Sequence, residues 1–301
     1  MVLFLDYLEK YKNLNPEKIL IKEIKAELVI DFLEYLQMVR KVNNSTRNLR
    51  LAGIKSFFRF LMYQNIESLY ETQRILSIHT KKTKNDLVKY ISKDAMKLIM
   101  EQPNLNTKRG VRQLAIISLM YDSAARVSEL INLTPSMLRI ENPSTIRITG
   151  KGNKVRLVPL MDAQLIHLKN YIKIFNLDNP VNQLQPLFFN SRREKLTRAG
   201  VTYILRAMVN KARVKNPEVF PDKISCHTLR HTKAMHMLQA GLELIYIRDI
   251  LGHSSIETTQ IYAKADTLQK RIALENTYEN LSPEEPLWEG NKGLINWLKT
   301  F

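Results

Sequence analysis

Residues 226–262 contain the sequences CHTLRH at 226–231, LGH at 251–253 and TTQIY at 258–262. A histidine, an arginine, a second histidine and a tyrosine therefore follow one another at positions 227, 230, 253 and 262. Arginine pairs bidentately with phosphate oxygens, histidine exchanges protons near neutral pH, and tyrosine supplies a hydroxyl nucleophile. This set of side chains indicates chemistry at a phosphate group.

Two upstream segments extend the set. The sequence ARVSEL contains Arg126, and the sequence GKGNK contains Lys151 and Lys154. Displacement at a phosphodiester requires cationic donors on the nonbridging oxygens, a nucleophile and a proton donor for the leaving oxygen. Arg126 and Arg230 are candidates for the donors and Tyr262 for the nucleophile. Lys151 is the candidate proton donor, and Lys154 is its rival for that role.

The charge balance points to an anionic partner. The 301 residues include 46 Lys and Arg against 29 Asp and Glu, a net charge of +17. Residues 1–80 carry a net charge of +3 and residues 81–301 carry +14, so most of the surplus lies in the later part. Nucleic acid is the expected partner of a surplus this large.

The single cysteine, Cys226, excludes an intramolecular disulfide and a cysteine-rich metal site, which fits a reducing cytoplasm. No run of 18 apolar residues is present, and the apolar start at 1–5 lacks basic residues, so we expect neither a membrane span nor a signal peptide. His227 and His231 are four residues apart, but Arg230 between them would repel a cation. We therefore expect no metal site.

Apolar residues at helical spacing predict a helical N-terminal domain over 1–78. In its second helix they are Leu28, Val29, Phe32, Leu33 and Leu36. Ser45 or Thr46 is expected to cap the next helix, over about 46–64, with Leu49, Ile54, Phe57, Phe58 and Leu61 on its apolar face. The charged, aperiodic stretch that follows predicts a basic linker over 79–90.

Residues 91–280 are expected to form a second, catalytic domain, beginning with a helix capped by Ser92. Residues 145–149 and 154–160 alternate apolar and polar around the turn sequence GKGN, which predicts a β-hairpin. In its second strand Val155 and Leu157 are the apolar members of the alternation. The tail, 281–301, predicts a short amphipathic helix that must dock on its own domain or on a neighbouring subunit.

In order and spacing, these residues resemble the tyrosine recombinase (phage integrase) family, whose pattern is Arg, Lys, His-x-x-Arg, His or Trp, and Tyr. Every member of the pattern is matched here, by Arg126, Lys151, His227, Arg230, His253 and Tyr262. Glu129 matches the acidic residue that supports the active-site arginine. The segments 150–160 and 251–262 are similar to the Xer branch. The resemblance covers about residues 90–270.

The resemblance implies a mainly α fold with a small β-sheet, in which a helical, SAM-like core-binding domain and a catalytic domain form a C-shaped clamp around DNA. It implies that Tyr262 attacks the scissile phosphate, giving a 3′-phosphotyrosyl link and a free 5′ hydroxyl. Lys151 would protonate the 5′ oxygen and His227 would act as base or hydrogen-bond partner. Arg126, Arg230 and His253 would stabilise the transition state. Strand exchange would then proceed through a Holliday junction, with no cofactor.

The partners that the resemblance implies are double-stranded DNA with an inverted-repeat site, three further copies of the chain in a tetramer, and an accessory protein. The expected location is cytoplasmic and nucleoid-associated. The candidate DNA contacts are basic residues of the helix expected over about 46–64, of the linker and of the hairpin. They are Arg47, Arg50, Lys55, Arg59, Lys81, Lys82, Lys84, Lys154 and Arg156.

Residues 232–236 differ from the small, apolar run associated with cellular Xer proteins. This favours a mobile-element integrase or transposase over an Xer-type chromosome or plasmid dimer resolvase. A non-catalytic DNA-binding regulator and a type IB topoisomerase are more distant alternatives. The complete catalytic set disfavours the regulator, and the tail helix disfavours the topoisomerase because it favours assembly.

Overall fold

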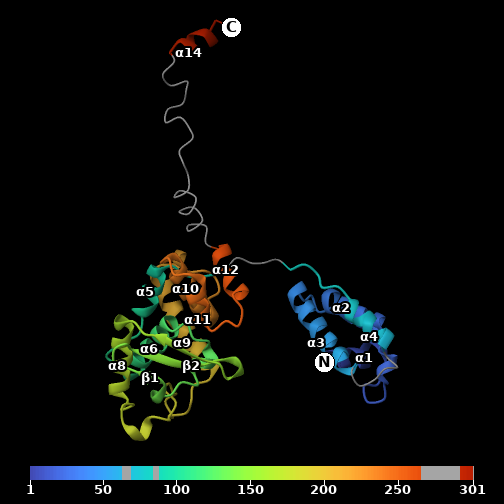
Figure 1. The fold of residues 1–301 in the computed structure, drawn as a ribbon, viewed down its shortest axis with the longest axis horizontal. Helices are drawn as coiled ribbons and strands as arrows, with labels where there is room; N and C mark the ends of the chain where they lie inside the picture. Colours follow the sequence, from blue (N-terminus) through green and yellow to red (C-terminus); the bar gives the residue numbers. More distant parts are fainter. Residues whose placement is uncertain (63–68, 84–87, 266–291, 301) are drawn as a thin grey trace. The chain divides into compact units, whose positions relative to one another are not determined.

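The computed structural model of the protein describes residues 1–62, 69–83, 88–265 and 292–300. The fold is mainly α-helical with one small sheet, as the sequence predicts. The chain divides into two compact units, Met1–Asp86 and Leu87–Phe301 (Figure 1). Lys84 and the first part of the predicted tail, 281–291, lie outside the described residues.

The N-terminal unit is built from helices that surround a core of their own. Its helices are α1 (Val2–Lys12), α2 (Ala26–Met38), α3 (Asn44–Met62) and α4 (Leu69–Ser77), with a 3-10 turn at Ile21–Glu23. Phe4, Phe32 and Phe58 are each 1% exposed in this core. Burial of three aromatic rings makes a large apolar contribution to the stability of so small a unit.

The start of α3 differs from the prediction in two ways. The Asn43 side chain, and not Ser45 or Thr46, caps the helix by accepting the Thr46 amide at 2.8 Å. Leu49 is 67% exposed, whereas Leu51 is fully buried. The buried stripe of α3 runs through positions 51, 54, 58 and 61. Leu49 lies two residues before this stripe, and its side chain therefore points away from the core.

The beginning of the predicted linker lies along α3. The Asn48 amide side chain bonds the backbone of Lys81 in both directions, at 2.7 Å and 3.0 Å, and Asn44 donates to the Lys82 carbonyl at 2.8 Å. The Lys81 ammonium donates to Gln37 of α2 at 2.6 Å. The backbone of 81–82 is therefore held to the N-terminal unit, with both lysines exposed.

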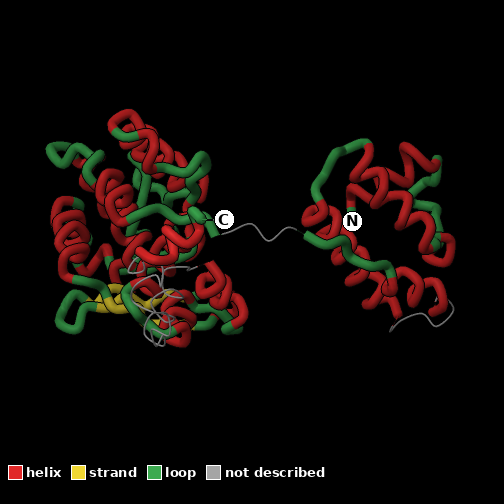
Figure 2. The backbone as a smooth tube through the Cα atoms, turned by 90° about the horizontal axis from the view of Figure 1, so that it is seen from above, coloured by secondary structure: helices red, strands yellow, loops and turns green. Residues whose placement is uncertain are grey.

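The C-terminal unit contains helices packed around a three-stranded sheet, which is yellow in Figure 2. Its α-helices are α5 (Lys93–Met100), α6 (Lys108–Asp122), α7 (Val127–Leu130), α8 (Asp162–Ile174), α9 (Arg198–Lys215), α10 (Cys226–Gln239), α11 (Leu244–Leu251), α12 (Glu257–Ala265) and α14 (Lys292–Leu298). Ser92 caps α5 by accepting the Ala95 amide at 3.1 Å, as predicted. Ser225 caps α10 in the same way through the Thr228 amide, so the CHTLRH sequence begins a helix.

The sheet is antiparallel in the order β1 (Leu138–Arg139), β2 (Thr145–Thr149), β3 (Val155–Pro159). The predicted hairpin is β2 and β3, but the expected pattern on β3 is reversed. Val155 and Leu157 are 58% and 66% exposed. The register pairs buried Ile148 with Arg156 and Ile146 with Val158, so Arg156 lies on the inner face. This inward arginine becomes part of the site described below.

Helices α10, α11 and α12 of the C-terminal unit pack on one another (Figure 1). A small apolar cluster joins them, formed by Ala124, Ala234, Met235, Ile247, Leu251 and Tyr262. Each of these residues is at most 1% exposed. The cluster holds the ends of α6, α10, α11 and α12 together, and these are the elements that carry most of the predicted site.

Candidate active site

Three of the predicted catalytic side chains line one hollow of about 680 Å³ in the C-terminal unit. Arg126 lies at the start of α7, Lys151 in the β2–β3 turn and His253 just after α11. Lys154 and Arg156 line the same hollow. A concave surface that collects this many cations is suited to an anionic group such as a phosphate.

Glu129 fixes the position of Arg126. Its carboxylate accepts the Arg126 amide at 2.8 Å and the Arg126 guanidinium at 2.9 Å. The Glu129 side chain is 5% exposed and that of Arg126 is 35% exposed. Arg126 is therefore anchored at one edge while much of its guanidinium still faces the hollow.

Arg156 is the second partner of Glu129. Its guanidinium donates to the carboxylate at 2.7 Å and 3.2 Å, and its Nε donates to the Ile250 carbonyl at 2.8 Å. Burial alone would raise the pKa of Glu129, but the bonds from Arg156 and Arg126 outweigh burial and lower it. Arg156 is thus a brace between β3, α7 and α11 that also lines the hollow, and its role as a DNA contact stays a prediction.

Gly252 allows this brace to pass close to the backbone. Its φ of +64° is unfavourable for residues with a side chain. A Cβ atom at this position would lie 2.9 Å from Nη1 and 3.0 Å from Cδ of Arg156. The glycine in the LGH sequence therefore ends α11 in the left-handed conformation and leaves room for Arg156.

Arg230 is 1% exposed and is held by backbone carbonyls. It donates to Ala124 at 2.7 Å and to Leu251 at 2.5 Å, and thereby joins α10 to the ends of α6 and α11. Burial, followed by the charge of Arg126, lowers its pKa to about 10, so it is still cationic at neutral pH. These two bonds use two of the five N–H donors of its guanidinium.

The two predicted histidines are placed differently. His227 is exposed on the first turn of α10, and desolvation together with Arg230 and Arg126 lowers its pKa. His253 is half-buried, and its Nδ1 lies 2.9 Å from the Thr259 hydroxyl. Burial, with Arg230 and Arg126 nearby, lowers the pKa of His253 to about 4. His253 is therefore neutral at pH 7 and can donate an N–H to a phosphate oxygen.

Tyr262 does not line the hollow. Its side chain is 1% exposed, and its hydroxyl lies 2.9 Å from Nδ1 of His231. Burial raises the pKa of Tyr262 to about 12, although Arg230 and Arg126 act in the opposite direction. Both arginines of the predicted phosphate clamp are therefore close enough to act on this phenol.

Sequence reasoning assigned no role to His231, which contacts Tyr262. One signal in the sequence could have found it. His231 follows His227 by four residues, so both side chains lie on the same face of α10. Their ring centroids are 4.4 Å apart.

The predicted DNA contacts divide into accessible and inaccessible residues. Arg47 is 7% exposed and donates to the His79 carbonyl, which places it among the inaccessible candidates. Lys55 is half-buried. The exposed candidates are Arg50, Arg59, Lys81, Lys82 and Lys154.

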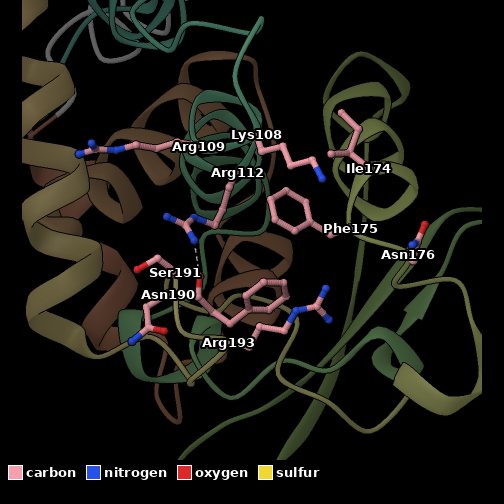
Figure 3. Close-up of a pocket in the computed structure, with 10 residues that line it drawn as sticks. Lys108, Arg109, Arg112, Ile174, Phe175, Asn176, Asn190, Ser191 and Arg193 are labelled. Carbon is pink, nitrogen blue, oxygen red and sulfur yellow. Dashed lines mark hydrogen bonds between the residues drawn. The ribbon is translucent and has the colours of Figure 1, made fainter.

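A second hollow, of about 410 Å³, lies at the other end of α6 and is also basic (Figure 3). Lys108, Arg109, Arg112 and Arg193 line it. Arg109 points away from Lys108 in this view, and Arg112 donates to the Phe189 carbonyl at 2.9 Å. None of its lining residues is a tyrosine, histidine or acid. The hollow at Arg126 is the candidate active site because it brings together Arg126, Lys151 and His253, three members of the predicted catalytic set.

Two further properties concern the described residues only. They contain no group of three or more histidine, cysteine or acidic side chains arranged to hold a metal ion. None of their helices combines the length and the apolar character that crossing a bilayer requires.

Comparison with known proteins relates the chain to DNA recombinases. The model of the phage integrase family matches residues 69–269. A Sinorhizobium fredii protein that carries only a provisional name, integrase/recombinase y4rC, is 32% identical over 91% of this chain and 81% of its own length. The tyrosine recombinase XerD of Oceanobacillus iheyensis is 33% identical over 84% of this chain and 82% of its own length.

Solved structures share the fold. The XerH site-specific recombinase bound to a palindromic difH substrate matches with a TM-score of 0.69 at 23% identity, over 92% of this chain and 78% of that one. The Tn1549 transposon integrase in complex with a circular intermediate DNA matches with a TM-score of 0.67 at 15% identity, over 92% of this chain and 98% of that one.

Proposed function

Since the chain belongs to the phage integrase family of tyrosine recombinases, we propose that it cuts and rejoins DNA through a 3′-phosphotyrosyl link formed by Tyr262. The protein is a site-specific DNA recombinase. The observation that carries the proposed chemistry is the packing of Tyr262 against α10, where its hydroxyl lies 2.9 Å from Nδ1 of His231, the residue next to Arg230. DNA is its substrate, in keeping with the net charge of +17.

The proposed first step is an in-line displacement. The Tyr262 oxygen forms a bond to the scissile phosphorus while the bond from phosphorus to the 5′ oxygen breaks. Arg126, Arg230 and His253 donate to the nonbridging oxygens as charge develops. Lys151, exposed in the turn between β2 and β3, gives its proton to the leaving 5′ oxygen. His227, exposed on the first turn of α10, is a further hydrogen-bond partner of the phosphate.

Tyr262 must first become accessible. Its side chain is 1% exposed beneath α11 and α10, with Leu251, Ile247 and Met235 in the same cluster. We propose that DNA binding opens the packing of α11 over this cluster and exposes the phenol to the phosphate, while α12 keeps its contact with α10. A buried nucleophile limits cleavage before the complex is assembled, because a phosphate cannot reach it.

For the biological role we propose recombination of a mobile element. The polar residues at 232–236 suggested this role. Two of them also have partners on α6: Lys233 pairs with Asp122 at 3.0 Å, and His236 lies 2.8 Å from the Tyr121 hydroxyl. Dimer resolution of the Xer type is the second candidate, favoured by the 33% identity to a XerD protein. Amplification across the flanks of the gene distinguishes them, because only a mobile element yields a circular junction and an empty site.

We propose that four copies assemble on two inverted-repeat sites and that the C-terminal helix α14 packs on a neighbour. The two-unit division of the chain supports a core-binding domain and a catalytic domain, with the boundary between Asp86 and Leu87. Deletion of residues 287–301 should weaken pairing of two sites in a gel-shift assay far more than binding to one site. Loss of folding in that variant would instead assign the tail to its own catalytic unit.

A plasmid assay tests recombination itself. A supercoiled plasmid carrying two copies of the site should yield two circles, or an inverted segment, according to the orientation of the sites. Relaxation of the plasmid with no exchanged product would assign the protein to topoisomerase chemistry. Binding without cleavage would assign it to regulation.

A further inference from the structure

The hydroxyl of the proposed nucleophile has a defined partner. Nδ1 of His231 on α10 lies 2.9 Å from the hydroxyl of Tyr262 on α12. The two rings are 5.6 Å apart between centroids, and His231 is half-buried. A hydroxyl and an imidazole nitrogen at this distance share one hydrogen, so one of the two atoms accepts it.

We propose that His231 is the base of the reaction: its Nδ1 holds the Tyr262 hydroxyl and takes the phenolic proton as the oxygen attacks phosphorus. This inference rests on the proposed function, in which Tyr262 is the nucleophile. The residue for which family resemblance suggests a basic role is His227. His227 is exposed, whereas the histidine in hydrogen-bond contact with the Tyr262 hydroxyl is His231.

Burial and the neighbouring charges keep His231 neutral, so that one ring nitrogen has a free lone pair. His227 and Arg230 on α10 and His253 after α11 surround it, together with Tyr262 on α12. Burial, followed by His227 and Arg230, lowers the pKa of His231 to about 4. The neutral imidazole can carry its hydrogen on Nε2, which leaves the lone pair of Nδ1 directed at the phenol.

The phenol needs such a partner. Burial raises the pKa of Tyr262 to about 12, so only about one molecule in 10⁵ would carry a phenolate at pH 7 without a base. A positioned imidazole removes the need for free phenolate, because it takes the proton while the oxygen–phosphorus bond forms and the phenolic oxygen becomes strongly acidic. Such general-base catalysis typically contributes about 10²–10⁴-fold.

The protons balance over the cycle. In cleavage, the oxygen–phosphorus bond to Tyr262 forms, its proton passes to Nδ1 of His231, and Lys151 protonates the departing 5′ oxygen. In rejoining, a 5′ hydroxyl attacks phosphorus and gives its proton to Lys151, while the imidazolium of His231 returns its proton to the phenol. The neighbouring cation Arg230 makes that imidazolium a strong acid, which favours the return.

The test uses a matched pair of histidines on the same helix. His236 contacts the Tyr121 hydroxyl through its Nδ1 at 2.8 Å and is buried, so it reproduces the contact of His231 outside the site. Asparagine at either position keeps a hydrogen-bonding group near Nδ1 but cannot take up a proton. Single-turnover formation of the covalent adduct would be measured for wild type, His231→Asn, His231→Ala and His236→Asn, each with a thermal melt.

We expect His231→Asn and His231→Ala to form the adduct about 10²–10⁴-fold more slowly, with a rate that rises tenfold per pH unit because free phenolate is then required. Added imidazole should partly restore His231→Ala. His236→Asn should match wild type. A wild-type rate and pH profile in folded His231→Asn would overturn the proposal, and the same pH change in His227→Asn instead would assign the base to His227. If wild-type protein formed no adduct at all, the proposed function would fail before this inference was reached.

Discussion

Glu129 binds Arg126 at two points, because its carboxylate accepts both the backbone amide and the guanidinium of that residue, at 2.8 Å and 2.9 Å. The remaining acceptor capacity of the carboxylate is taken by Arg156. One buried carboxylate therefore orients two arginines that line the hollow, the half-exposed Arg126 and the more buried Arg156. The proposed phosphate clamp depends on this carboxylate as much as on its arginines.

Replacement of Glu129 tests this dependence. Glu129→Leu leaves Arg156, whose side chain is 10% exposed, without a counter-charge. Breaking a buried pair in this way should lower the free energy of unfolding by about 3–5 kcal/mol, measured by urea denaturation. The double variant Glu129→Leu/Arg156→Met should recover most of that stability and still cleave DNA poorly, since Arg126 has lost its anchor. Full activity in the stable double variant would contradict the positioning role.

Gly252 offers a test with an internal control. Gly252→Ala would place a Cβ atom 2.9 Å from Arg156 at a position with a left-handed backbone. Gly241 is also left-handed, with a φ of +85°, but the Cβ atom of Gly241→Ala would have no neighbouring atom within 4 Å. Both should lose about 1–2 kcal/mol of unfolding free energy from backbone strain. Only Gly252→Ala should also slow cleavage, because it displaces the guanidinium that pairs with Glu129. Equal cleavage rates in the two variants would show that the close approach is unimportant.

The proton donor can be identified with a modified leaving group. Lys151→Ala should slow cleavage of ordinary DNA by about 10²–10⁴-fold and should have little effect on DNA with a 5′-thio leaving group, which departs without protonation. Lys154→Ala, three residues away on the same exposed turn, is the matched control and should slow both substrates equally. The reverse result would transfer the role to Lys154.

Acid should destabilise the protein through three groups of the site. The pKa values of His231 and His253 are lowered to about 4, and that of Glu129 is also lowered. A lowered folded-state pKa means that the unfolded chain binds more protons, so the stability these groups contribute is present at pH 7 and is lost on acidification. The stabilisation from the two histidines is lost as the pH falls from about 6.5 to about 4. The stabilisation from the Glu129 carboxylate is lost as the pH falls below about 4.5.

Urea denaturation at pH 7.5, 5.5 and 4.5 measures this loss. The free energy of unfolding should fall at each step, and a His231→Asn/His253→Asn double variant should lose less than wild type between pH 7.5 and 4.5. Parallel curves for the two proteins would contradict the lowered pKa values of the histidines.

The sequence predicted those features that depend on local pattern. Ser92 as a cap, the β2–β3 hairpin and the helical N-terminal unit follow from capping chemistry, alternation and helical spacing. The order of the basic and aromatic residues of the site identified the family, because few chemistries combine two arginines, a lysine, two histidines and a tyrosine at this spacing.

What the sequence could not supply depends on contacts between distant elements. Arg47 and Arg156 look like surface cations in the sequence, yet each is buried by a partner that no local pattern reveals: the His79 carbonyl for one and Glu129 for the other. The alternation on β3 was misread because register decides which face is inward, and Glu129 makes an inward Arg156 tolerable. The contact of His231 with Tyr262 spans 31 positions and requires the packing of α12 on α10.

Covalent trapping tests the central claim, that Tyr262 forms a link to a DNA 3′ end. Wild type and Tyr262→Phe would be incubated, without added metal, with nicked suicide substrates from the flanks of the gene and separated on denaturing gels. The account predicts a protein–DNA band for wild type, linked to a 3′ end, and none for Tyr262→Phe although that variant binds the same DNA. A band of equal intensity in Tyr262→Phe, or a link to a 5′ end, would contradict it.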